Sequence, residues 1–190
     1  MIQSDKFDSA NMNIKKITNL TLLFALKRFI EIFGMVILFI GLILLISLIS
    51  YSPDDPNFIF PDSTNIQNIL GFKGSYTSDL FFQSIGIISY LIPITLIFTG
   101  INILLSKDIF LIIENIFYSI LYTIVGSLFF AYFFNNSFTF FINGNGGFVG
   151  NYFNKSFLND IILVNENIAF YILLFIIIGL FLLSINFRVK

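Results

Sequence analysis

The sequence predicts an all-α integral membrane protein with four transmembrane helices, and three observations favour this class. First, 57% of the 190 residues are hydrophobic and only 11% are charged, whereas a soluble domain carries roughly 25% charged residues. Second, the mean hydropathy is +0.92. Third, four apolar stretches each supply the ~20 residues that a helix needs to cross a ~30 Å hydrocarbon layer. These predicted spans are about 29–50, 80–105, 109–134 and 168–187.

The chain before the first span is polar and then mixed, so we expect residues 1–28 to be a partly flexible N-terminal segment and residues 29–190 to be the four-helix domain. The first span is too long for the ~7–15-residue core of a cleaved signal peptide. It ends in the turn-forming residues 50–56, which contain two prolines and two aspartates. We therefore expect an uncleaved first helix.

The second span contains Pro93, which removes a backbone N–H and is predicted to kink the helix. Only Ser106, Lys107 and Asp108 separate this span from the third, so the two must form a tight hairpin. The fourth span follows a second long polar loop. The first and second spans are predicted to form one hairpin, and the third and fourth spans a second. The short turn at Lys107 would join these two hairpins.

The distribution of Lys and Arg predicts the orientation, because cytoplasmic loops carry an excess of these residues. Two of them lie on the side of the two long loops, 51–79 and 135–167, namely Lys73 and Lys155. Within about 20 residues of a span, the range that the rule counts, the termini and the short turn carry seven, namely Lys15, Lys16, Lys27, Arg28, Lys107, Arg188 and Lys190. We therefore expect both termini in the cytoplasm and both long loops in the periplasm.

A short internal repeat accompanies the two hairpins. The run 71–76, Gly-Phe-Lys-Gly-Ser-Tyr, recurs as Gly-Phe-Val-Gly-Asn-Tyr at 147–152, and each copy lies between a long loop and an even-numbered span. Both hairpins start from the same side, so duplication would relate them by an axis along the membrane normal. Glycines three residues apart allow close backbone packing. The sequence thus predicts two parallel repeats.

The residue types offer little chemistry for catalysis. The chain has no His and no Cys, which removes the commonest general base, the commonest metal ligand and all thiol chemistry. We expect no catalytic residue, metal or other cofactor. A membrane enzyme would have to use Asp54 and Asp55, the best acid pair, but a Pro- and Asp-rich run is more typical of a turn.

Two acids lie in the predicted spans and are functional candidates by position. Glu31 is placed to pair with Lys27 or Arg28 on the surface of the first helix. Glu114 lies six residues into the third span, near Asn102 and Asn115, and either reaches the headgroups or contacts a partner helix. The sequence leaves the role of Glu114 open.

The first long loop and its flanking residues contain two motifs that are typical of a known family. Ser-Tyr-Ser-Pro-Asp-Asp-Pro at 50–56 ends the first span, and Asn-x-x-Gly-x-x-Gly at 68–74 precedes Ser-Asp-Leu at 78–80. This pattern, followed by a helix with a central proline, resembles the N-terminal four-helix membrane domain of FtsK/SpoIIIE-type bacterial DNA translocases. The sequence departs from the family in having Ser75 and Ser78 where alanine is usual, and in lacking Trp. The residues that carry the resemblance and the repeat are Pro53, Asp54, Asp55, Pro56, Gly71, Gly74, Asp79, Pro93, Gly146, Gly147 and Gly150.

The resemblance implies a membrane anchor at the division septum of the bacterial inner membrane that couples division to chromosome segregation. It also implies a homo-oligomer, with a hexamer expected from the family's ring-shaped motor, and contacts with other divisome membrane proteins and the lipid bilayer. It does not imply ATP hydrolysis or direct contact with nucleic acid by this chain, because the family's motor lies outside these residues. The alternative hypothesis is a small multi-pass transporter or channel subunit.

Overall fold

The computed structural model describes residues 2–56, 65–134, 142–156 and 162–186, and within these ranges all regular secondary structure is helical. Four helices are long and apolar enough to cross a membrane, namely Thr18–Ile49, Gly71–Ser106, Leu111–Phe133 and Glu166–Ser184. The predicted all-α fold with four apolar helical segments is therefore confirmed.

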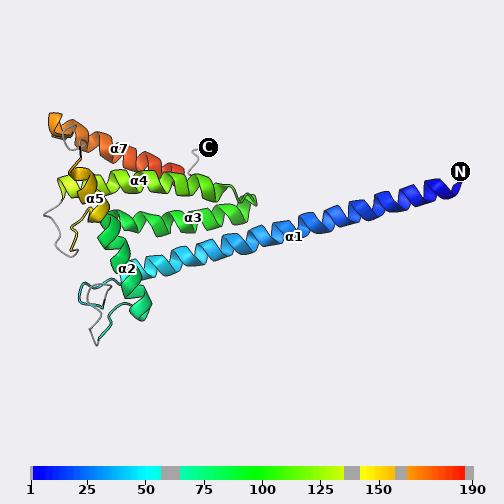
Figure 1. Cartoon of the computed structure of the whole chain (residues 1–190), viewed down its shortest axis with the longest axis horizontal. Helices are drawn as coiled ribbons and strands as arrows, with labels where there is room; N and C mark the ends of the chain where they lie inside the picture. The colour runs from blue at the N-terminus through cyan, green and yellow to red at the C-terminus, as the bar shows by residue number, and fades with distance from the viewer. Residues whose placement is uncertain (1, 57–64, 135–141, 157–161, 187–190) are drawn as a thin grey trace.

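Four long helices run side by side, and two shorter ones lie at one end of the bundle (Figure 1). We call this end the loop end, and the opposite end, where residues 107–110 join two helices, the turn end. Helix α2 runs across the others at the loop end, and α5 lies beside it (Figure 1). In chain order the elements are α1 (Ile2–Ile49), α2 (Gly71–Ile85), the 3-10 helix η1 (Gly86–Tyr90), α3 (Leu91–Ser106), α4 (Leu111–Phe133), α5 (Gly147–Asn154) and α7 (Glu166–Ser184).

Helix α1 is longer than the span predicted at 29–50, because it begins at Ile2 and its apolar part begins at Thr18. The helix continues through residue 28, and the chain between 13 and 28 contains neither Pro nor Gly to end it. Forty-eight residues at ~1.5 Å each make α1 about 72 Å long. It therefore extends well past the turn end of the bundle (Figure 1).

The second predicted span, 80–105, requires a correction. Its first residues belong to α2, which lies across the bundle, and the direction changes at Gly86. The predicted kink at Pro93 is wrong, because Pro93 is the third residue of α3, where a missing N–H disturbs little of the helix. Gly86 has φ 71° and ψ −148°, a backbone conformation that is open almost only to glycine.

Helices α1 and α3 pack closely through small residues. A Cβ on Gly100 would lie 2.7 Å from the carbonyl oxygen of Gly34, and one on Gly41 would lie 3.0 Å from the carbonyl oxygen of Pro93. Positions 34, 37, 41, 44 and 48 of α1 are buried, as is Ser47, and the first five follow the alternating spacing of three and four of a packed helix seam. This seam, Gly34–Gly41–Gly100, makes the first hairpin a backbone-to-backbone contact of the kind that associates helices in lipid.

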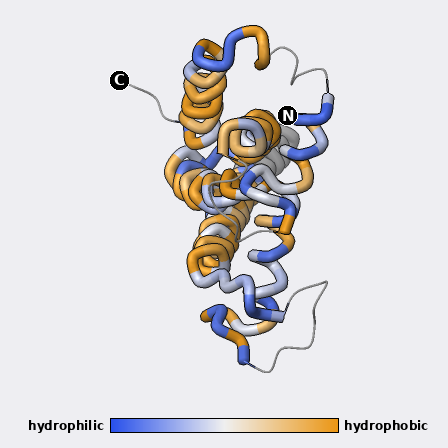
Figure 2. Tube along the Cα trace, turned by 90° about the vertical axis from the view of Figure 1, so that its left-hand side faces the viewer, coloured by the Kyte–Doolittle hydropathy of each residue, from blue (hydrophilic) through white to orange (hydrophobic). Residues whose placement is uncertain are grey.

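The second hairpin packs through aromatic and aliphatic side chains instead. Ile88 of η1, Tyr122 and Phe129 of α4 and Ile177 of α7 form its buried cluster. Viewed from the loop end, hydrophobic residues dominate the helices, and the hydrophilic stretches lie mainly in the connecting segments (Figure 2). This distribution is what a bundle surrounded by lipid requires.

Candidate functional site

Asp55 holds the turn that follows α1. Its side chain is 3% exposed, and its two carboxylate oxygens accept hydrogen bonds from the backbone N–H groups of Gln67 (2.6 Å) and Asn68 (2.9 Å). The neighbouring Asp54 is exposed. Only one member of the acid pair is therefore buried, and its lone pairs serve the backbone of the loop rather than a substrate.

Asn68 connects this loop to the end of α1. Its side-chain amide donates to the carbonyl oxygens of Ser47 (2.9 Å) and Ser50 (3.2 Å), which α1 leaves without helical partners. The Asn68 side-chain oxygen lies so close to Gly74 that a Cβ there would be 2.1 Å away. The Asn-x-x-Gly-x-x-Gly motif thus caps the C-terminal end of α1 and packs the start of α2 against it.

The start of α2 adds two further polar contacts to this loop. Ser75 donates to the carbonyl oxygen of Pro56 at 2.6 Å, so its hydroxyl joins the start of α2 to the loop. Tyr51 donates to the buried carboxylate of Asp79 at 3.4 Å, and Gln83 donates to the same oxygen at 3.2 Å. Burial and the Asp79 carboxylate both raise the pKa of Tyr51, which keeps the hydroxyl protonated as a donor.

We predict that Asp55→Ala lowers the free energy of unfolding by about 1.5–3 kcal/mol, because two backbone N–H groups, that of the buried Asn68 and that of the exposed Gln67, lose a charged acceptor. Asp54→Ala is the matched control, since it removes an exposed carboxylate one residue away. Thermal unfolding of the purified protein in detergent compares the two variants. Equal melting temperatures for both variants would show that the Asp55 bonds contribute nothing to stability.

The two copies of the glycine repeat occupy equivalent places. Gly71 begins α2 with φ 65° and Gly147 begins α5 with φ 63°. In each copy the N–H of this glycine bonds back to the carbonyl three residues earlier, that of Asn68 (2.8 Å) or Gly144 (3.1 Å). Each copy is therefore a turn that starts a short helix at the loop end.

The second copy docks onto the break between α2 and η1. The N–H of Ile87 donates to the carbonyl oxygen of Asn145 at 2.9 Å. A Cβ on Gly86 would lie 1.8 Å from that same oxygen, and one on Gly147 would lie 2.6 Å from the N of Gly86. A Cβ on Gly150 would lie 2.2 Å from the carbonyl oxygen of Ser127 in α4. We call these residues, Gly86, Ser127, Asn145, Gly146, Gly147 and Gly150, the glycine junction.

Hydrogen bonds inside the bundle join α3 to α4 and α7. Thr95 lies 3.1 Å from the hydroxyl of Tyr122 and 3.0 Å from that of Ser184, all three being buried. Thr99 lies one turn further along α3, and it accepts a hydrogen bond from the side-chain amide of Asn115 in α4 at 2.7 Å. These contacts satisfy polar groups that lipid could not.

Glu114 is not part of these contacts. It is exposed and lies in the first turn of α4, while Asn115 bonds Thr99 and Asn102 bonds the carbonyl oxygen of Ile185 at 3.0 Å. The two amides proposed as its partners therefore use their donors elsewhere. Its position near the turn end fits a carboxylate that reaches the headgroup level.

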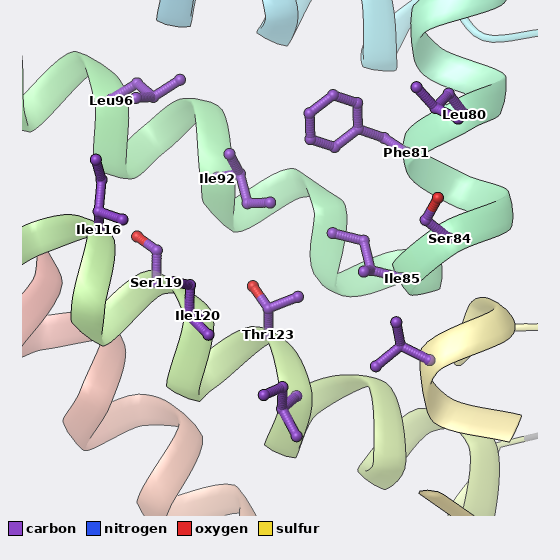
Figure 3. Close-up of a pocket in the computed structure, with 12 residues that line it drawn as sticks. Leu80, Phe81, Ser84, Ile85, Ile92, Leu96, Ile116, Ser119, Ile120 and Thr123 are labelled. Carbon is purple, nitrogen blue, oxygen red and sulfur yellow. The ribbon is translucent and has the colours of Figure 1, made fainter. Parts of the chain in front are cut away.

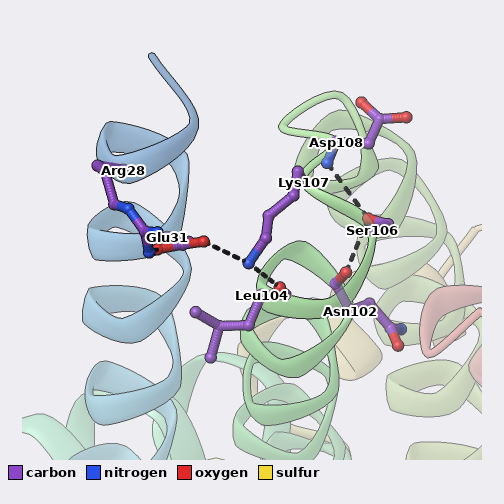
Figure 4. Close-up of polar contacts among 7 residues, drawn as sticks. All are labelled: Arg28, Glu31, Asn102, Leu104, Ser106, Lys107 and Asp108. Atoms are coloured by element: carbon purple, nitrogen blue, oxygen red, sulfur yellow. Dashed lines mark hydrogen bonds and ion pairs between the residues drawn. The ribbon is translucent and has the colours of Figure 1, made fainter. Parts of the chain in front are cut away.

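Glu31 joins α1 to the turn between α3 and α4 (Figure 4). Its carboxylate pairs with Arg28 at 2.5 Å, as the spacing predicts, and with Lys107 at 2.8 Å. Lys107 has φ 60° and also donates to the carbonyl oxygen of Leu104. The pair with Lys107 could not be seen in the sequence, because it depends on how α1 packs against α3.

The contacts described above join helices and loops to one another. Within 2–56, 65–134, 142–156 and 162–186, no group of three or more His, Cys, Asp or Glu residues could hold a metal ion. Pro53 and Asp54 are exposed, and Pro93 is buried against α1. The predicted site residues did not include Gly86, which interrupts the second predicted span, or Asn145, which lies in the Gly-rich stretch 144–150.

Comparison with known proteins gives a consistent result. Residues 26–189 match the family described as the 4TM region of DNA translocase FtsK/SpoIIIE. The chain is 38% identical over 63 residues to the DNA translocase FtsK of Rickettsia typhi, and 31% identical over 88 residues to that of Azospirillum brasilense. These alignments cover 33% and 45% of this chain but 8% and 14% of the relatives. No solved structure matches the chain.

Proposed function

Since this chain belongs to the family of the FtsK/SpoIIIE four-helix membrane region, we propose that it anchors and oligomerises an FtsK-like DNA translocase in the bacterial inner membrane. The observation that carries the proposal is the family match over residues 26–189 together with four apolar helices in two packed hairpins. In this role the chain acts in cell division and chromosome segregation without supplying the motor. Its partners are the bilayer, further copies of itself and other divisome membrane proteins, and it makes no direct contact with nucleic acid.

The proposal is tested by the position and the association state of the whole chain in a dividing bacterium. A fluorescent fusion should gather as a band at the septum. Two differently labelled copies should transfer excitation energy to each other there. A uniform membrane signal without energy transfer would contradict both the septal anchor and the oligomer, whereas a band without transfer would contradict only the oligomer.

We also predict the orientation of the helices. A reporter that is active only outside the cytoplasm should work when fused between residues 57 and 68 or between 154 and 160, and should fail at Lys107 and Lys190. The physical reason is the seven-to-two distribution of Lys and Arg described above. Activity at Lys190 would mean an odd number of crossings, and α7 would then not span the membrane.

Glu114→Gln distinguishes an anchor from the transporter hypothesis. A transporter depends on an ionisable group at membrane depth, whereas an anchor needs only the packed bundle. Because Glu114 is exposed in the first turn of α4, we predict normal membrane insertion, self-association and cell length in a strain that depends on the full-length translocase. Ion flux through the purified protein in liposomes that disappears with Glu114→Gln would support the transporter instead.

A further inference from the structure

An apolar depression lies under α2 on the face of the bundle that α2 overhangs. Its floor is α3, its walls are α1 and α4, and α2 closes it toward the loop end (Figure 3). It consists of two lobes with volumes of about 550 Å³ beside α1 and about 440 Å³ beside α4. Each volume falls within the ~300–1,000 Å³ typical of small-molecule sites. Both lobes are lined by Phe81, Ile92 and Leu96.

The depression exists because α2 does not continue the direction of α3. The break at Gly86 turns α2 across the bundle (Figure 1), and residues of α2 and α3 line both lobes. Phe81 projects from α2 toward α3 (Figure 3) and belongs to both lobes. Phe81 therefore stands between two lobes that are lined mostly by apolar side chains.

A cation lies at the mouth of the lobe beside α1. Lys73 lines this lobe together with Thr77, and the remaining lining residues of that lobe are mostly aliphatic. Lys73 is exposed, and the ion pairs among the described residues involve Arg28, Glu31 and Lys107 rather than Lys73. Because Lys73 lies near the start of α2, at the loop end of the bundle, we place its ammonium group at the level of the lipid headgroups, next to the apolar lobe that it lines.

We propose that the depression binds one anionic phospholipid, with its phosphate beside Lys73 and its acyl chains in the lobes on either side of Phe81. A charged headgroup site above an apolar space matches both ends of such a lipid. A helix from a second copy fits less well. It is a rod about 10–12 Å wide, and the ring of Phe81, which lines both lobes, stands in the space that such a rod would occupy.

The experiment measures lipid retention by the purified full chain with native mass spectrometry, after exchange into detergent containing phosphatidylglycerol or phosphatidylcholine. The parent should retain phosphatidylglycerol preferentially. Lys73→Gln should lower this preference about two- to fivefold, the range for one exposed charge pair. Lys155→Gln is the matched control, an exposed lysine at the same end of the bundle, and should change nothing.

Leu96→Trp tests the apolar part of the site, because Leu96 lines both lobes and a larger ring would fill them. It should reduce retention of both lipids, and Ile43→Trp, in the lobe beside α1 only, should reduce it less. Equal retention of the two lipids by the parent, or equal effects of Lys73→Gln and Lys155→Gln, would overturn the proposal. Loss of self-association with unchanged lipid retention would assign the depression to a second copy of the chain.

Discussion

Gly86→Ala is expected to remove most of the folded protein. Two costs add at this residue. The backbone at φ 71° and ψ −148° costs a residue with a Cβ about 1–3 kcal/mol. The new Cβ would also lie 1.8 Å from the carbonyl oxygen of Asn145, and such overpacking costs typically about 1–3 kcal/mol more. The sum is a large part of the stability of an ordinary domain. The yield of monodisperse protein on size-exclusion chromatography and its melting temperature measure the loss.

Two other glycines allow the cost of the backbone conformation to be measured apart from the cost of the close contact. Gly71 has φ 65° but nothing lies within 4 Å of an added Cβ, and Gly179 in α7 has neither a positive φ nor a neighbour. We therefore expect Gly71→Ala to cost about 1 kcal/mol from backbone conformation alone, and Gly179→Ala to be neutral. If Gly86→Ala behaved like Gly71→Ala, the contact with Asn145 would not be present in the protein.

Gly100→Leu is expected to separate α1 from α3. The Cβ of any residue at this position would lie 2.7 Å from the backbone oxygen of Gly34 and 2.7 Å from the backbone nitrogen of Leu38. Backbone atoms cannot move aside as a flexible side chain can, so the two helices must move apart. Helices in lipid associate through such close contacts between small residues, and we expect a loss of about 3 kcal/mol, at the upper end for overpacking.

The separation can be measured directly, because the chain contains no Cys and cysteines can be introduced in pairs. Cysteines at Gly34 of α1 and Ile103 of α3 should cross-link readily in the parent, because a Cβ on Gly34 would lie 3.3 Å from the Cβ of Ile103. Cross-linking should be lost in Gly100→Leu. Gly179→Leu, on an open face of α7, should leave it unchanged. Efficient cross-linking in Gly100→Leu would show that α1 and α3 are held together by other contacts.

The spans were predictable because hydrophobic length is a local property of the sequence. The third and fourth spans, predicted at 109–134 and 168–187, are observed as Leu111–Phe133 and Glu166–Ser184. The loop motifs were also recognisable, since Pro, Asp and Gly have local conformational preferences. The family resemblance based on them is confirmed by the match over residues 26–189.

The break at Gly86 was not predictable from the same local rules. Pro93 is the stronger helix breaker by intrinsic preference, yet it falls in the first turn of α3, where its missing N–H disturbs little. Gly86 has a positive φ at the place where the carbonyl oxygen of Asn145, far along the chain, accepts a hydrogen bond from the N–H of Ile87. Likewise, the pairing of Glu31 with Lys107 depends on the packing of α1 on α3.

The hydrogen bond from Ile87 to Asn145 also imposes an order in time during synthesis. When the ribosome has produced α1, α2 and α3, the acceptor for this N–H does not yet exist, and an unpaired amide at membrane depth is unfavourable. The first hairpin can close its glycine seam at this stage, but α2 cannot yet settle across it. Helix α4 and the residues after it must first leave the ribosome. The later half of the chain therefore completes the folding of the earlier half, and the two hairpins mature as one unit.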